Sequence, residues 1–213
     1  MHKIYVLGVG PGSSDFLPPV TAQKAAESDV LVGGRRSLAL FEDLEKEKIE
    51  ITGRLDPVIK AINQKREKKK IAVLVSGDTG IYSLLPRLAE TFGRYSLEVY
   101  PGISAAQYFF ARLGLCWHEA VFISLHGRSS DELLQQALTA KRLVVFTDPK
   151  HTPALICREL VEAGFVNKKI YLGEDLSYPE ERISSGCPED FTTYEASGLN
   201  VMIIDSDLNL KID

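Results

Sequence analysis

The sequence has no long apolar run, only three cysteines and no excess of basic residues. Its longest apolar stretches, residues 71–75 and 201–204, fall far short of the roughly 20 residues of a membrane helix, so no membrane partner is expected. Cys116, Cys157 and Cys187 form no CxxC pair, which disfavours disulfides or a metal site and favours buried free thiols. Since 29 acidic residues outnumber 25 basic ones, no general attraction for nucleic acid is expected.

What the sequence does contain is the composition of an ordinary globular protein. Of its 213 residues, 45% are hydrophobic and 25% are charged, which excludes disorder, collagen and a coiled coil. A chain of this length forms one large domain or two small ones. Its first residues enter a strand pattern directly, without the layout of a signal peptide. We therefore expect a cytoplasmic protein.

Short aliphatic runs alternate with helix-like stretches along the whole chain, which predicts an α/β fold. The runs are apolar on both faces, as in a sheet that helices cover on each side. The predicted domain boundary, or seam, follows Gly114 and gives two α/β lobes, residues 1–114 and 115–213. The predicted strands are residues 4–9, 29–32, 71–75, 97–100, 120–124, 143–147, 169–172 and 200–205. One predicted helix follows Pro18-Pro19. The other predicted helices span residues 57–70, 84–92, 104–113, 130–138 and 153–163.

Three glycine-containing turns follow predicted strands in the first lobe. The first, Gly8-Val9-Gly10-Pro11-Gly12-Ser13, lacks the last glycine of a dinucleotide-binding GxGxxG motif and the lysine of a phosphate-binding loop. Its backbone would allow close approach of a flat ligand, although a plain tight turn explains it as well. The third is Pro101-Gly102-Ile103-Ser104, in which Ser104 suits a helix N-cap.

The second turn, Ser76-Gly77-Asp78, offers exposed amides and a carboxylate acceptor at the end of an apolar strand. In open α/β sheets, ligands bind beyond the carboxyl ends of the strands. Asp78 therefore suits a ribose or an amine. The alternative is that it only caps the following helix.

In the second lobe, polar loops again follow predicted strands. His126, Arg128, Lys150 and His151 lie on two of these loops and supply cationic donors for carboxylates. The alternative for each of these residues is an ordinary surface side chain with no binding role. No nucleophile-elbow or HExxH motif is present in the sequence, so hydrolase and zinc-enzyme functions lack support.

These motifs, in this order, resemble the tetrapyrrole (corrin/porphyrin) methylase family. The resemblance begins at Val9-Gly10-Pro11-Gly12 and continues through Ser76-Gly77-Asp78 and Pro101-Gly102-Ile103-Ser104. Further segments are similar to the branch that methylates C5 of cobalt-precorrin-7. They are Val32-Gly33-Gly34-Arg35-Arg36-Ser37-Leu38, Ala111-Arg112-Leu113-Gly114-Leu115, Ser124-Leu125-His126-Gly127-Arg128, His151-Thr152-Pro153 and Leu199-Asn200-Val201.

The resemblance implies a homodimeric C-methyltransferase of two α/β lobes, with S-adenosylmethionine in the cleft between them and a tetrapyrrole as substrate. The cofactor contacts that it implies are Pro11, Ser76, Gly77, Asp78, Ile81, Ser104, Ala105, Thr147 and Gly173. The carboxylates of such a substrate fit the cations Arg35, Arg36, His126, Arg128 and His151. No catalytic base is identified, because methyl transfer to an electron-rich ring carbon depends mainly on alignment. Some branch members continue into a C15-methylase/decarboxylase, so this chain is expected to need a separate partner for that step.

The sequence departs from the family pattern at two places. Thr79 replaces the proline that usually follows Gly-Asp, which we expect to loosen that loop. Gly33-Gly34-Arg35 stands where uroporphyrinogen methylases carry Tyr-Asp-Arg, which disfavours their activity here. The alternatives are a methylase acting on another precorrin carbon, an rRNA ribose or diphthine, and a non-catalytic corrinoid-binding protein.

Overall fold

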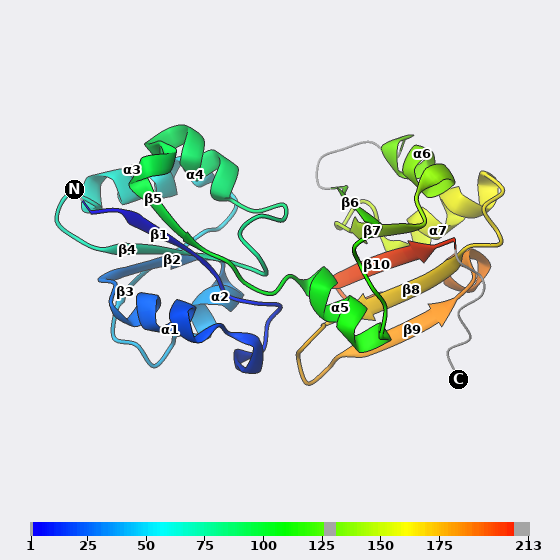
Figure 1. Cartoon of the computed structure of the whole chain (residues 1–213), viewed down its shortest axis with the longest axis horizontal. Coiled ribbons are helices and arrows are strands. Elements are labelled where there is room, and N and C mark those ends of the chain that lie inside the picture. The colour runs from blue at the N-terminus through cyan, green and yellow to red at the C-terminus, as the bar shows by residue number, and fades with distance from the viewer. Residues whose placement is uncertain (1, 126–130, 207–213) are drawn as a thin grey trace. The chain divides into compact units, whose positions relative to one another are not determined.

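The computed structural model describes residues 2–125 and 131–206. By its contacts the chain divides into a first unit, Met1–Ala105, and a second unit, Ala106–Asp213. Each unit contains one five-stranded sheet with helices packed on it (Figure 1). The expectation of an α/β protein with two α/β parts is therefore confirmed.

The sheet of the first unit is parallel throughout, with the strand order β3-β2-β4-β1-β5. Its core strands are almost wholly buried aliphatic residues, as a sheet covered on both faces requires. Helices α1 and α2 pack on one face, and α3 and α4 pack on the other (Figure 1). The strands are β1 (Ile4–Gly8), β2 (Val30–Gly33), β3 (Glu47–Glu50), β4 (Ile71–Val75) and β5 (Leu97–Tyr100). The helices are α1 (Pro19–Ala26), α2 (Arg35–Ala39), α3 (Leu55–Lys65) and α4 (Leu85–Phe92), with 3-10 turns η1 (Ser14–Phe16) and η2 (Arg94–Ser96).

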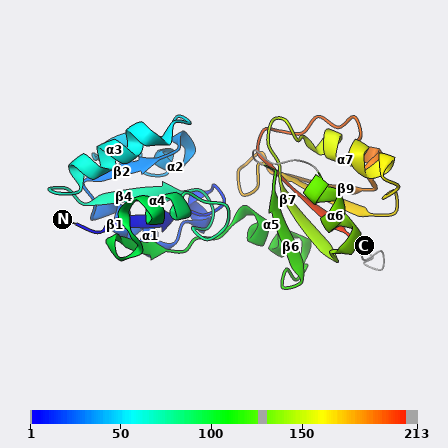
Figure 2. The ribbon, with the colours of Figure 1, turned by 90° about the horizontal axis from the view of Figure 1, so that it is seen from above.

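The second unit has a mixed sheet with the order β6-β7-β10-β8-β9. Strands β6 and β7 are parallel, whereas β10 runs antiparallel to both β7 and β8. Figure 2 shows α5 on one side of these strands and α6 and α7 on the other. The strands are β6 (Ala120–Ser124), β7 (Arg142–Phe146), β8 (Lys169–Glu174), β9 (Arg182–Gly186) and β10 (Asn200–Asp205). The helices are α5 (Ala105–Leu113), α6 (Asp131–Thr139) and α7 (Pro153–Glu162), with the 3-10 turn η3 (Pro188–Phe191).

Contacts assign almost all of α5 to the second unit, whereas the sequence places the seam after this helix, at Gly114. The reason is how α5 packs. Its buried Phe109 lies against Gly173 of β8, and its Tyr108 donates a hydrogen bond to Glu181. The first residue of α5, Ala105, is the last residue of the first unit.

The sequence analysis did not predict β3, β9 or α2. It predicted that α3 continues to residue 70, whereas the helix ends at Lys65. Strand β3 is a short edge strand with charged, partly exposed residues, so it has no apolar run to detect. Helix α3 ends at Lys65 because the chain must turn into β4. The backbone N–H of Lys70 donates to Asp29, and its carbonyl accepts from Asp29.

Cys157 is a buried free thiol, as expected, but Cys116 is exposed and Cys187 is partly exposed, so the expectation of burial is wrong for these two. Burial raises the pKa of the Cys157 thiol to about 12.

The helices of the described residues, 2–125 and 131–206, include none with the length and apolar character that a membrane span requires.

Candidate functional site

The three glycine turns of the first unit meet at one edge of its sheet. Strands β4, β1 and β5 are parallel neighbours, so the turns that follow them leave the sheet side by side. Gly10 and Gly77 form a backbone bridge, in which each N–H donates to the carbonyl of the other over 3.2 and 2.8 Å. The three turns that the sequence analysis singled out therefore lie together at this edge.

Glycine is required here because backbone packs directly against backbone. A Cβ at Gly102 would lie 2.2 Å from the carbonyl oxygen of Gly77, and a Cβ at Gly8 would lie 2.4 Å from the Gly102 nitrogen. Gly10 and Gly77 also have φ angles of 86° and 69°, a backbone conformation that residues with a Cβ atom rarely adopt. The result is a rigid floor of turn backbone at the carboxyl edge of the sheet, where α/β proteins bind ligands.

The carboxylate of Asp78 joins two of these turns. Its Oδ1 accepts the N–H of Gly80 over 2.7 Å, and its Oδ2 accepts the N–H of Gly102 over 3.0 Å. The alternative of a helix cap is wrong, because α4 begins at Leu85, after the N-cap residue Leu84. Each oxygen retains a lone pair, so Asp78 can brace the turns and still accept a ligand donor.

The loop that follows Asp78 is held by further hydrogen bonds. Thr79 is buried, and its carbonyl accepts the hydroxyl of Ser83, which in turn accepts the N–H of Leu85. These bonds tie the loop at the position where the family usually has a proline. Tyr82 on this loop has a φ angle of 45° and is 48% exposed.

The predicted cofactor contacts of the first unit lie on these three turns or directly after them, since Ile81 is on the loop that follows Asp78 and Ala105 begins α5. Ser104 is buried next to Gly77, whose Cβ position is 3.4 Å from the Ser104 Cα atom. Ser76 is exposed, and Ile81 is partly buried. The structure thus brings together Pro11, Ser76, Gly77, Asp78, Ile81, Ser104 and Ala105.

The predicted substrate cations are only partly described. Arg35 and Arg36 are both exposed on the first turn of α2, which follows β2 at the same edge of the sheet as the glycine turns. His126 and Arg128 lie outside the described residues. His151 lies in the second unit, where its Nδ1 is 3.0 Å from Oδ1 of Asp148.

Asp148 organises the loop after β7. Its Oδ1 also accepts the backbone N–H groups of Lys150 and His151 over 2.8 and 2.7 Å. The N–H of His151 is the main reason why the pKa of Asp148 is lowered. The next residue, Thr152, caps α7 by accepting the N–H of Leu155.

Thr147 and Gly173 reach the same edge of the second sheet, on either side of β10. The hydroxyl of Thr147 donates to Oδ1 of Asn200 over 2.6 Å, and Asn200 pairs in register with Glu174. A cavity of about 580 Å³ lies at the end of β7. It is lined by Thr147, Asp148, Pro149, Thr152, Pro153, Ala154, Arg158, residues 192–198 and Asn200.

Sequence reasoning missed two carboxylates in the second unit. Glu174, at the end of β8, is completely buried and accepts hydrogen bonds from Arg182, Tyr194 and the N–H of Ser197 at 2.7–2.8 Å. Glu181 accepts three more, from residues of α5 and of its own loop. An acidic residue directly after the apolar run of β8 was the available signal for Glu174.

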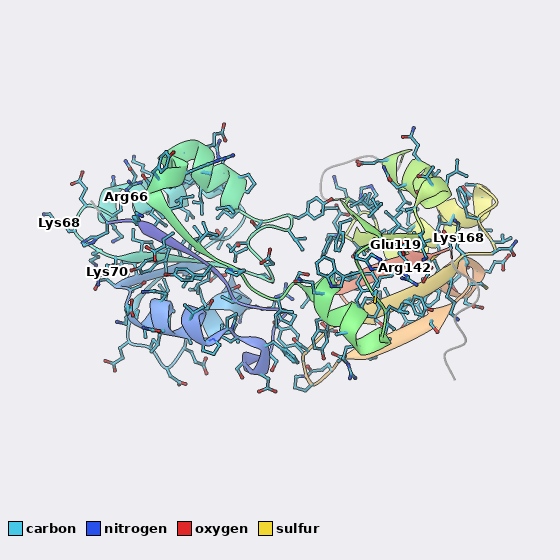
Figure 3. All side chains as sticks on the ribbon, in the orientation of Figure 1. Arg66, Lys68, Lys70, Glu119, Arg142 and Lys168 are labelled. Atoms are coloured by element: carbon cyan, nitrogen blue, oxygen red, sulfur yellow. The ribbon has the colours of Figure 1, made fainter. Side chains whose placement is uncertain are left out.

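Three of the cations in the basic run at residues 65–70 are engaged within the first unit. Lys65 and Lys69 both pair with Glu47, at 2.6 and 2.7 Å, and Arg66 is buried over the ring of Phe92. Figure 3 shows Arg66, Lys68 and Lys70 together at the start of β4, the edge of the sheet opposite the glycine turns. In the second unit the same figure shows Arg142, whose guanidinium pairs with the buried Asp205 over 2.8 Å.

Comparison with known proteins now decides the family. A family model described as Tetrapyrrole (Corrin/Porphyrin) Methylases matches residues 3–188. The chain belongs to the tetrapyrrole methylase family. The resemblance seen in the sequence is thereby confirmed.

Two relatives in this family align with most of the chain. The cobalt-precorrin-7 C(5)-methyltransferase of Salmonella typhimurium is 32% identical over 178 residues, which cover 84% of this chain and 87% of the relative. The probable cobalt-precorrin-7 C(5)-methyltransferase of Methanocaldococcus jannaschii is 29% identical over 212 residues, which cover 96% and 98%.

The fold of this tetrapyrrole methylase is shared with a solved structure of the family. The uroporphyrin-III C-methyl transferase from Thermus thermophilus, complexed with S-adenyl homocysteine, superposes with a TM-score of 0.78 at 21% identity. The match covers 96% of this chain and 97% of that one. The likeness therefore extends over both α/β units.

Proposed function

We propose that this chain is an S-adenosylmethionine-dependent C-methyltransferase of corrin-ring biosynthesis that methylates C5 of cobalt-precorrin-7. The observation that carries the proposal is the identity of 32% over 84% of the chain with a relative of that name. The three converging turns supply the second support, since they bring residues that the family resemblance assigns to the cofactor to one edge of the sheet.

The backbone of the turns suits this cofactor for a physical reason. Because glycine has no side chain, the amides and carbonyls of these turns can lie close to a bound ligand that has a flat nucleoside and an amino-acid group. Asp78 keeps lone pairs for a ligand donor while it fixes the turns after β4 and β5. In the first unit Pro11, Ser76, Gly77, Asp78, Ile81, Ser104 and Ala105 would hold the cofactor. Thr147 and Gly173 are the candidates in the second unit.

The reaction requires mainly that the ring carbon, the methyl group and the sulfur be held in line. The sulfonium of the bound cofactor supplies an activated methyl group, which an electron-rich ring carbon displaces from sulfur in one SN2 step. The carbon–methyl bond would form as the methyl–sulfur bond breaks, and the electron pair of that bond would remain on sulfur. Loss of a proton from the methylated carbon would then remove the positive charge left on the ring. The protein then needs no strong base, since holding the reacting atoms in line can contribute up to roughly 7–11 kcal/mol.

The substrate carries several carboxylates, so its binding requires cationic donors. Arg35 and Arg36 are exposed beside the glycine turns, at the end of β2. His151 is held by Asp148 after β7. We assign these residues, with His126 and Arg128, to the substrate.

We also propose a cytoplasmic homodimer, with a separate C15-methylase/decarboxylase as its partner in the pathway. Light scattering of the purified protein tests the dimer. A monomer at micromolar concentration would remove that part of the proposal and leave the reaction untouched.

The test of the function is a reaction with defined substrates. The protein is incubated with cobalt-precorrin-7 and S-adenosylmethionine labelled in its methyl group, and the product is examined by NMR. A labelled methyl on C5 supports the proposal, whereas a label on another carbon assigns a different methylase activity. Binding of S-adenosylhomocysteine without any methyl transfer to a tetrapyrrole would overturn it. Absence of all such binding would favour a corrinoid-binding protein.

A further inference from the structure

The loop between β8 and β9 carries an unusual backbone. In residues 175–181, Asp175 and Ser177 have φ angles of 46° and 70°, in the left-handed region that residues other than glycine avoid. Such conformations persist where surrounding contacts leave the chain no alternative, and they cluster at functional sites. This loop directly follows Gly173 and Glu174 at the end of β8.

One carboxylate holds the loop to helix α5. Glu181 accepts the N–H of Ser177 over 2.7 Å, the hydroxyl of Tyr108 over 2.6 Å and Nε of Arg112 over 2.8 Å. Tyr108 and Arg112 are four residues apart on α5 and therefore lie on the same face of the helix. The side chain of Glu181 is only 15% exposed. It thus links a strained loop to a helix that packs on the second sheet through its buried face.

The charges of these groups favour the link. Burial and the hydrogen bond to Glu181 raise the pKa of Tyr108 to about 12, so Tyr108 remains a donor. Burial alone would raise the pKa of Glu181, but the hydrogen bonds from Tyr108, Ser177 and Arg112 outweigh it and lower the pKa. Glu181 is therefore an anionic acceptor at neutral pH, and bonds to a charged acceptor are the stronger ones.

The same helix and loop close over Gly173. A Cβ at Gly173 would lie 2.8 Å from Cδ2 of Leu176 and 3.0 Å from Cε2 of Phe109. Leu176 comes from the strained loop, and Phe109 comes from the turn of α5 that contains Tyr108. A shift of the loop relative to α5 would therefore change how the backbone at Gly173 is covered.

We propose that Glu181 is a positioning residue for the methyl donor. It fixes residues 175–181 against α5 and so sets the backbone at Gly173, a candidate cofactor contact. This role rests on the proposed function. It acts through the loop, without contact between Glu181 and the reacting atoms.

The test compares Glu181→Gln with Glu180→Gln, a matched control because Glu180 is exposed and loses the same charge. Binding of S-adenosylhomocysteine is measured by calorimetry, and the melting temperature is measured in parallel. Glutamine keeps the size of the side chain but loses the charge and one acceptor oxygen, so its NH₂ group faces either Nε of Arg112 or the donors of Tyr108 and Ser177. We expect Glu181→Gln to weaken binding about 10-fold, since small displacements of a binding group have effects of this size. The control should bind as the wild type does.

A second variant separates positioning from general stability. Glycine adopts a φ of 70° without steric cost, so Ser177→Gly should restore the loop when its brace is missing. We expect Ser177→Gly to recover at least about threefold of the lost affinity in the Glu181→Gln background and to change wild-type affinity less than twofold, a coupling that a double-mutant cycle detects. A residue needed only for stability would lower the melting temperature without this coupling.

The outcomes distinguish the two proposals. Wild-type protein that binds no S-adenosylhomocysteine overturns the proposed function. If the wild type binds and the folded Glu181→Gln variant binds equally well, or if Ser177→Gly recovers nothing, the positioning role is overturned and the function stands. Should Glu181→Gln not fold, Tyr108→Phe, which removes a single donor, should weaken binding about threefold. Unchanged binding in that variant would also overturn the role.

Discussion

Oδ2 of Asp78 lies 3.0 Å from the backbone nitrogen of Gly102, 24 residues later in the chain, and accepts its N–H. This bond joins the turn after β4 to the turn after β5, two strands that do not pair with each other because β1 lies between them. Asp78 therefore contributes to the shape of the site before any ligand binds.

The first prediction concerns this brace. Asp78→Ala leaves the N–H groups of Gly80, which is exposed, and Gly102, which is partly buried, without their acceptor. Loss of a hydrogen bond to a charged group costs about 1.5–3 kcal/mol. We expect the free energy of unfolding to fall by about that amount and the affinity for S-adenosylhomocysteine to fall about 10-fold. Urea denaturation and calorimetry measure the two effects.

Asp78→Asn serves as the comparison. Its amide oxygen can replace one acceptor but not both, so its losses should lie between those of the wild type and Asp78→Ala. If the folded alanine variant binds S-adenosylhomocysteine as tightly as the wild type, Asp78 is neither a cofactor contact nor a brace for one.

The second prediction concerns the close approach of two turns. A methyl group at residue 102 would lie 2.2 Å from the carbonyl oxygen of Gly77, so Gly102→Ala must push the turns apart. Overpacking of this kind costs at least about 1–3 kcal/mol, which should appear in chemical denaturation. Gly34→Ala is the control, because nothing lies within 4 Å of its Cβ position. Equal stabilities of the two variants would contradict the contact.

The first unit could be predicted well because its signals are local. An apolar run such as Ile71–Val75 can only be a buried strand here, and β4 has the predicted bounds. Parallel strands end at one edge of the sheet, so the meeting of the glycine turns follows from recognising strands and turns alone. The same local logic failed for β3, because an edge strand that contains Glu47 and Glu50 does not differ in composition from a loop.

The network around Glu181 could not be predicted, because its members are distant in the sequence. Tyr108 and Glu181 are 73 residues apart, and only the packing of α5 on the second sheet brings them together. Periodicity identifies α5 as a helix but does not say which sheet it covers. For that reason the sequence placed the seam after α5, while the contacts divide the chain before Ala106.

The third prediction is a pH dependence. The pKa of Glu181 is lowered in the folded protein, so its contribution to stability is present above the pKa of an unfolded glutamate, about 4.3. It is lost as the pH falls through the lower, folded pKa. We expect Glu181→Gln to lower the free energy of unfolding by about 2 kcal/mol at pH 7 and by clearly less at pH 3. Glu180→Gln should show no such difference, and a loss that is equal at both pH values would contradict the charged role of Glu181.

The fourth prediction separates substrate binding from cofactor binding. Arg35 is exposed on the first turn of α2, at the edge of the sheet that carries the glycine turns. If Arg35 and Arg128 pair with carboxylates of the tetrapyrrole, Arg35→Ala and Arg128→Ala should each weaken its binding by roughly 1–3 kcal/mol. Affinity for S-adenosylhomocysteine should change less than about twofold, because neither residue is a candidate cofactor contact.

Arg94→Ala provides the matched control for these two variants. Arg94 is also exposed, but it precedes β5 and lies at the opposite edge of the same sheet. Each variant is titrated with the corrinoid and, separately, with S-adenosylhomocysteine. An exposed arginine that only meets solvent contributes about 0–1 kcal/mol, so Arg35→Ala would then match Arg94→Ala. Unchanged corrinoid affinity in both Arg35→Ala and Arg128→Ala would remove these residues from the site, and parallel loss of both ligands would indicate misfolding instead.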